Sequence, residues 1–121
     1  MPTKYKINNT KKGRRFIEKE VNFKNDISFI DFSLANIIKS MTSIKKLNHK
    51  EGEKNICIRI GLTNTEGNDF FISSKFFKTQ NEALKDLLAK MDKKRKQFID
   101  RYDEKSQKLI KLNSVVVTVE Q

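Results

Sequence analysis

The strongest constraint on the fold comes from residues 55–63, NICIRIGLT, where apolar residues occupy every second position. These positions are Ile56, Ile58, Ile60 and Leu62. The positions between them are Cys57, Arg59 and Gly61. A period of two predicts a strand with one buried face and one open face. The segment NTEGND then supplies a turn, with Gly67 available for positive φ, and DFFISSKFF (69–77) completes a hairpin.

Two further segments have helical periodicity. Residues 26–47 carry an apolar stripe at three- and four-residue steps, and Asp26 or Ser28 can cap this helix. The stripe is made of Ile27, Ile30, Leu34, Ile37, Ile38 and Met41. Residues 80–109 predict a longer helix, because Thr79 and Glu82 form a capping box before an apolar stripe. That stripe contains Leu84, Leu87, Leu88, Met91, Phe98 and Tyr102. At full length this helix would span roughly 45 Å, so we expect its C-terminal half to project past the core.

The ends of the chain complete the expected architecture. Residues 1–13 are basic and predict a flexible arm, whereas 14–23 alternate as a strand. The β-prone ending SVVVTVEQ either returns to the sheet or pairs with a partner chain. We therefore expect one α+β domain over 14–121, in β-α-β-β-α-β order. It would have a small sheet of three to four strands packed against two helices, the second long and basic.

Positive charge is the feature that bears most on function. The chain has 26 Lys and Arg against 15 Asp and Glu, for a net charge of +11. Such a field attracts polyanions, nucleic acid first and anionic membrane second. A basic surface that serves only solubility remains the alternative.

The basic residues gather in three places that predict nucleic-acid contacts. Most of the non-core circumference of the second helix is expected to be positive, with the contacts Lys85, Lys90, Lys93, Lys94, Arg95, Lys96 and Arg101. The N-terminal segment offers Lys11, Lys12, Arg14 and Arg15, together with Lys4 and Lys6. The open sheet face offers Arg59 and Lys75, beside which Phe71 could stack on a base.

Residue types that catalysis would need are scarce. Cys57 is the only cysteine and His49 the only histidine, so no metal cluster or nucleophile–base pair is expected. No phosphate-binding glycine motif occurs, and no apolar run is long enough to span a membrane. We expect a nucleic-acid-binding protein, with structured RNA favoured over duplex DNA, that is not an enzyme and has no cofactor. The expected location is the cytoplasm, an organelle matrix, or a virion or its host's cytoplasm.

Residues 54–105 resemble the ribosome hibernation-promoting factor family, also called ribosome-associated inhibitor. The resemblance lies in the hairpin followed by QNEALKDLLAKMDKKRKQ, and upstream in VNFKNDISFIDFSLANIIKSM. It implies a β-α-β-β-β-α order and binding in the decoding channel of the small ribosomal subunit. The residues that it would bring to rRNA are Lys85, Lys93, Lys94, Lys96 and Arg101. One strand seen in that family is missing before residue 55, and the N-terminal arm and VVVTV are extra.

Two other hypotheses stay open. FISSKFFKTQNEALKDLL is similar to the strand-to-helix join of integrase arm-binding and AP2-type domains, which implies duplex-DNA binding through Arg59 and Lys75 on the sheet. Alternatively, the chain is a viral or phage interaction module that self-associates or binds a partner through 115–119.

Overall fold

The computed structural model describes residues 3–9, 15–32, 37 and 56–120. Their elements are β1 (Thr3–Asn9), β2 (Arg15–Ser28), β3 (Ile56–Thr63), β4 (Asp69–Ser73), α2 (Gln80–Arg101), α3 (Glu104–Gln107) and β5 (Lys111–Glu120). The α+β class is confirmed, although the sheet has five strands rather than three to four.

The sheet is antiparallel throughout and has the order β1-β2-β5-β3-β4. Its central strand is β5, the last element of the chain, so the β-prone C-terminal segment returns to the sheet. Val117 pairs with Lys19 of β2 on one side and with Ile58 of β3 on the other. A partner strand could therefore pair with residues 115–119 only by displacing β2 or β3.

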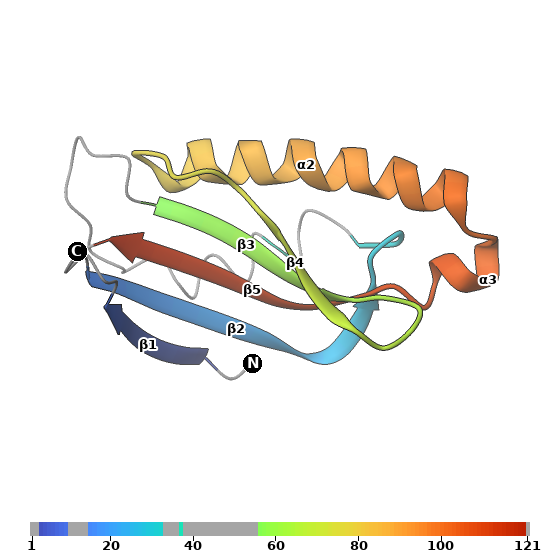
Figure 1. Ribbon diagram of the computed structural model, residues 1–121, viewed down its shortest axis with the longest axis horizontal. Helices are drawn as coiled ribbons and strands as arrows, with labels where there is room; N and C mark the ends of the chain where they lie inside the picture. Colours follow the sequence, from blue (N-terminus) through green and yellow to red (C-terminus); the bar gives the residue numbers. More distant parts are fainter. Residues whose placement is uncertain (1–2, 10–14, 33–36, 38–55, 121) are drawn as a thin grey trace.

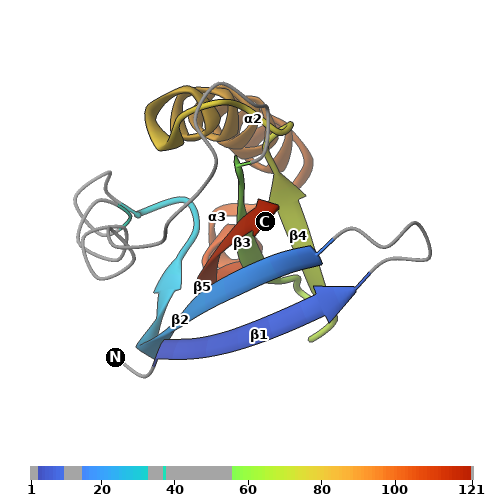
Figure 2. The same cartoon turned by 90° about the vertical axis from the view of Figure 1, so that its left-hand side faces the viewer.

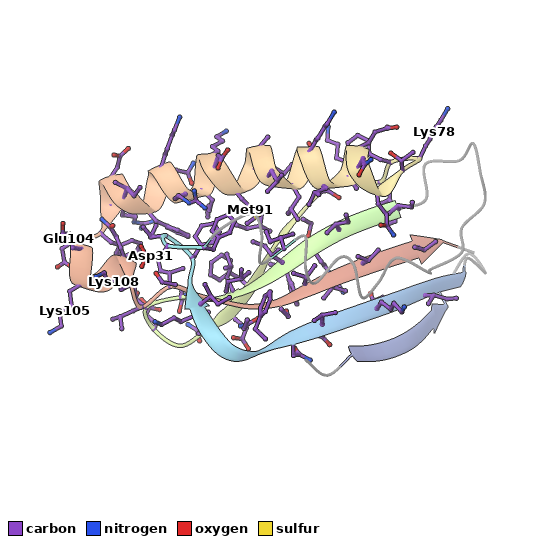
Figure 3. The ribbon with its side chains drawn as sticks, turned by 180° about the vertical axis from the view of Figure 1, so that it is seen from behind. Asp31, Lys78, Met91, Glu104, Lys105 and Lys108 are labelled. Atoms are coloured by element: carbon purple, nitrogen blue, oxygen red, sulfur yellow. The ribbon has the colours of Figure 1, made fainter. Side chains whose placement is uncertain are left out.

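Helix α2 lies along one face of the sheet, and α3 lies beyond its C-terminal end (Figure 1). The sheet is strongly twisted, so that β1 and β2 cross below α2 at a steep angle when viewed from the end (Figure 2). Alternate residues of β3, from Ile56 to Leu62, face α2 and are fully buried. Met91 points from α2 toward the sheet and is also fully buried (Figure 3). The predicted apolar stripe of α2 is confirmed, because all its members belong to this core or pack against it.

The N-terminal third differs from the expectation. Thr3–Asn9 form an edge strand, not a flexible arm, and their pairing with β2 satisfies backbone hydrogen-bonding groups of both strands. Residues 1–2 and 10–13 of the expected arm lie outside the described residues. Strand β2 continues to Ser28 through an irregularity after Asn22, and a turn follows at 29–31. The helix expected over 26–47 therefore does not begin at Asp26 or Ser28. Residues 33–47 of the expected helix lie outside the described residues except for Ile37, which is helical and fully buried.

The long helix expected over 80–109 is broken into two. Thr79 caps α2 as predicted, with its Oγ1 accepting a hydrogen bond from the Glu82 N–H at 3.2 Å. The helix ends where Tyr102 adopts an extended conformation, and Asp103 caps the short α3. The expected projection past the core is wrong, because Phe98 near the end of α2 is only 9% exposed and belongs to the core.

Candidate nucleic-acid interface

The run of four cations at positions 93–96 is divided between two environments. Lys93 and Lys96 are exposed on the outer side of α2. Lys94 and Arg95 are half-buried, because successive helical residues are about 100° apart and these two flank the apolar stripe. The run therefore does not form one positive surface.

Arg95 packs against aromatic residues that follow β2. Its guanidinium carbon lies 4.1 Å from the ring centroid of Phe32 and 5.9 Å from that of Phe29. Its Nη1 is 3.9 Å from Asp92 Oδ1, and its side chain is 27% exposed. These contacts give Arg95 a structural role in docking α2 onto the β2 end. Its availability to phosphate is correspondingly reduced.

The outer side of α2 is balanced in charge. Its cations are Lys85, Lys93 and Lys96, and its carboxylates are Glu82, Asp92 and Asp100. None of these three lysines forms an ion pair with another described residue, but the three carboxylates lie on the same side at helical spacing. This balance contradicts the expectation that most of the non-core circumference is positive.

The positive excess lies on the side of α2 that faces strand β4. Lys90, Lys94 and Arg101 follow one another at four- and seven-residue steps, so they share this side. Lys90 Nζ donates a hydrogen bond to the carbonyl of Ser73, at the end of β4, over 3.0 Å. The basic flank is defined as these three residues and Lys75, which follows β4.

Aromatic rings hold two of the flank cations in place. Lys94 Nζ lies 5.5 Å from the ring centroid of Phe98, and the Arg101 guanidinium carbon lies 5.9 Å from that of Tyr102. Both rings belong to the aromatic core beneath α2. Both contacts are longer than the 4.1 Å contact between Arg95 and Phe32, and Arg101 remains exposed on this side of α2.

One carboxylate, Asp86, joins β4 to the basic flank, and no sequence pattern singled it out. Its Oδ2 accepts a hydrogen bond from the Lys75 backbone N–H at 2.9 Å and lies 3.1 Å from Lys90 Nζ. The hydrogen bond from the Lys75 backbone N–H, and to a smaller extent the one from Lys90 Nζ, holds the pKa of Asp86 below its usual value. Asp86 is thus charged at neutral pH and is already engaged by two flank residues.

The Asp86 contacts predict a pH-dependent effect of the Asp86→Asn variant. Because the folded-state pKa is lowered, the ionised carboxylate stabilises the fold above its unfolded pKa, and this stabilisation is lost as the pH falls through the folded pKa. We expect the variant to have a smaller free energy of unfolding than the wild type at pH 7. The difference should shrink below about pH 4. Urea unfolding across this pH range measures it, and a difference independent of pH would contradict the assignment.

The sheet face away from α2 carries the other predicted contact, Arg59. Its Nη2 donates to Glu18 Oε1 at 2.9 Å, and its guanidinium carbon lies 4.8 Å from the ring centroid of Phe71. Glu18 and Arg59 belong to β2 and β3, so this ion pair crosses over β5 and helps to cover Val116, which is 3% exposed. Arg59 is therefore engaged within the protein.

The remaining predicted contacts are only partly described. Lys11, Lys12 and Arg14 lie outside the described residues, and Arg15 is placed only as the first residue of β2. His49 also lies outside them.

Cys57 packs against the end of β4. Its Sγ donates to the Ser74 carbonyl at 3.3 Å, and burial raises the pKa of its thiol. Among the described residues, no three His, Cys, Asp or Glu side chains are grouped to hold a metal ion. In that same part of the chain, no helix has the length and apolar character needed to cross a membrane.

No family model, curated protein or solved structure matches this chain. The resemblance to hibernation-promoting factors therefore remains a hypothesis. The position of β5 departs from the order it implies, because this strand follows the long helix and occupies the centre of the sheet.

Proposed function

We propose that this protein is a non-enzymatic nucleic-acid-binding protein that contacts the phosphate backbone through the basic flank. The observation that carries the proposal is the distribution of charge on α2. Three cations share the side facing β4 with one carboxylate, which is already paired with Lys90, whereas the outer side is balanced. Phosphate contacts by Lys and Arg release counterions, so such binding depends steeply on salt.

Structured RNA is the favoured ligand. Duplex-DNA reading through the sheet would need Arg59, which is engaged by Glu18 and Phe71. The resemblance to ribosome-bound factors also favours RNA, and the same cations of α2 would then contact rRNA. Strand β1, whose sequence includes Lys4 and Lys6, forms the opposite edge of the sheet.

A pair of charge-matched variants tests the location of the interface. Lys75→Glu/Arg101→Glu changes the basic flank, and Lys85→Glu/Lys96→Glu changes the outer side by the same number of charges. All four side chains are exposed, so both variants are expected to fold. The flank variant should bind a structured RNA roughly tenfold or more weakly at 0.1 M salt, with a salt slope shallower by about 1.4 to 1.8.

Fluorescence anisotropy with an RNA hairpin, duplex DNA and intact ribosomes over a salt series provides the measurement. Equal losses of affinity for the two variants would mean that the basic flank is not the interface and that binding depends only on the net charge of the protein. Wild-type protein that binds none of the three in a salt-dependent way would refute nucleic-acid binding itself.

A further inference from the structure

The edge strand β4 holds one aromatic side chain out of the core. Phe70 and Ile72 face α2 and belong to the core or pack against it, whereas Phe71 between them faces away and is 51% exposed. A large apolar ring in water is unfavourable relative to a buried one, by about 1.5–3 kcal/mol for full burial. Its position therefore suggests a contact that the isolated chain does not make.

The surroundings of Phe71 are nearly neutral in charge. The Arg59 guanidinium lies over its ring, and Glu18 neutralises Arg59 through the 2.9 Å ion pair. A phosphate would meet little net attraction here. An uncharged planar group would find an aromatic ring and a stacked guanidinium, which are the two side-chain surfaces on which unpaired bases stack.

Gly61 of β3 lies directly opposite Phe71 in the β3–β4 pairing. A Cβ at Gly61 would collide with Ser114 Oγ and Asn113 Oδ1, and it would lie 3.4 Å from the Phe71 ring. The Phe71 ring therefore lies within van der Waals distance of the place where a side chain at position 61 would begin. Such a glycine beneath an aromatic side chain fixes the ring's position along β3 and β4.

We infer that Phe71, supported by Arg59, is the stacking site for one unpaired base of the bound nucleic acid. This inference rests on the proposed function and adds the class of ligand, a single-stranded or loop nucleotide rather than a continuous duplex. The two surfaces meet at β4: Lys90 of the basic flank bonds the carbonyl of Ser73, two residues (about 7 Å) along the strand from Phe71. A nucleic acid that crosses this edge reaches cations on one side and the ring on the other.

The absence of tryptophan from the chain makes a direct test available. Phe71→Trp introduces a single indole at the site, and Leu109→Trp introduces one at a control position that is also 51% exposed. Stacking of a base should quench the indole in the Phe71→Trp protein saturably when an RNA hairpin with an unpaired loop is added. The fully paired stem without its loop should quench it much less, and the Leu109→Trp protein should respond weakly to both.

Phe71→Ala supplies the affinity measurement. Stacking of one base predicts a loss of roughly 5- to 150-fold in binding of the looped hairpin. The salt slope should not change, because no cation is removed. Circular dichroism should match that of the wild type.

The outcomes separate the two proposals. Salt-dependent binding of the hairpin that is unchanged in Phe71→Ala, or equal quenching at both indole positions, overturns the stacking site alone. Wild-type protein that binds duplex DNA or ribosomes but not the hairpin also overturns the stacking site, whereas wild-type protein that binds none of the three in a salt-dependent way overturns both proposals.

Discussion

Replacing Phe98 with alanine is expected to lower the free energy of unfolding by about 3–5 kcal/mol, as for large buried aromatic residues in general. The ring lies edge-on to Phe29, with centroids 5.8 Å apart, and edge-on to Phe70, with centroids 6.4 Å apart. It therefore joins α2 to the end of β2 and to β4 at once. The substitution would leave a cavity between three elements that are held by different parts of the chain.

The neighbouring residue provides the control. Ile99 is 47% exposed, and Ile99→Ala should change the free energy of unfolding by no more than about 0.5 kcal/mol. Urea unfolding followed by circular dichroism measures both variants. Equal values would mean that the C-terminal half of α2 is not docked on the sheet. In that case the end of the helix would project past the core, as its length in the sequence predicts.

The Phe98 contacts also bear on function. Lys94 lies over the Phe98 ring, and Arg101 lies over Tyr102 beside it. The position of these flank cations thus depends on the aromatic core beneath them. A cavity at Phe98 should loosen the basic flank as well as the fold.

The elements that could be predicted from sequence are those whose local pattern agrees with their environment. The alternation over β3, the hairpin with Gly67 at φ +82° and the Thr79 cap are each specified by a few neighbouring residues. Local pattern and tertiary packing point the same way there, which is typical of minimally frustrated segments.

The elements that were missed are those where two patterns compete. Ile27 and Ile30 fit a helical stripe, yet β2 runs through Ile27 because β5 offers a pairing partner, with Ile27 opposite Leu112. That partner is more than 80 residues away in sequence, so no local pattern could reveal it. The break in the long helix did have a signal, because Asp103 caps α3 by accepting from the Ser106 N–H at 2.7 Å.

The basic residues of α2 could be identified from composition, but their arrangement around the helix relative to the sheet could not. Charge counts identified α2, and the position of each cation around the helix followed from its spacing. What the sequence could not show is which side faces β4 and which carboxylates lie among the lysines. The packing of α2 places the Arg95 guanidinium over the Phe32 ring, and it lets Lys90 Nζ donate a hydrogen bond to the Ser73 carbonyl.

Removing β5 is expected to prevent folding altogether. In the described sheet, β2 and β3 each pair with β5 and not with each other, so the last strand is the link between the β1–β2 half and the β3–β4 half. A chain ending at Asn113 also loses several fully or almost fully buried valines. At about 1.5–3 kcal/mol for each buried side chain, that loss is comparable to the total stability of about 5–15 kcal/mol for a typical domain.

A stop codon after Asn113 tests this expectation, with a chain lacking only Gln121 as the control. The shorter chain should give no cooperative urea transition and no sheet signal by circular dichroism. A synthetic peptide of residues 114–121, added to it in excess, should restore part of the signal if β5 pairs as the structure shows. A cooperative transition in the shorter chain alone would contradict the central place of β5. The same topology means that the sheet cannot close until residues 114–120 have been synthesised, because the described strands give its two halves no other pairing.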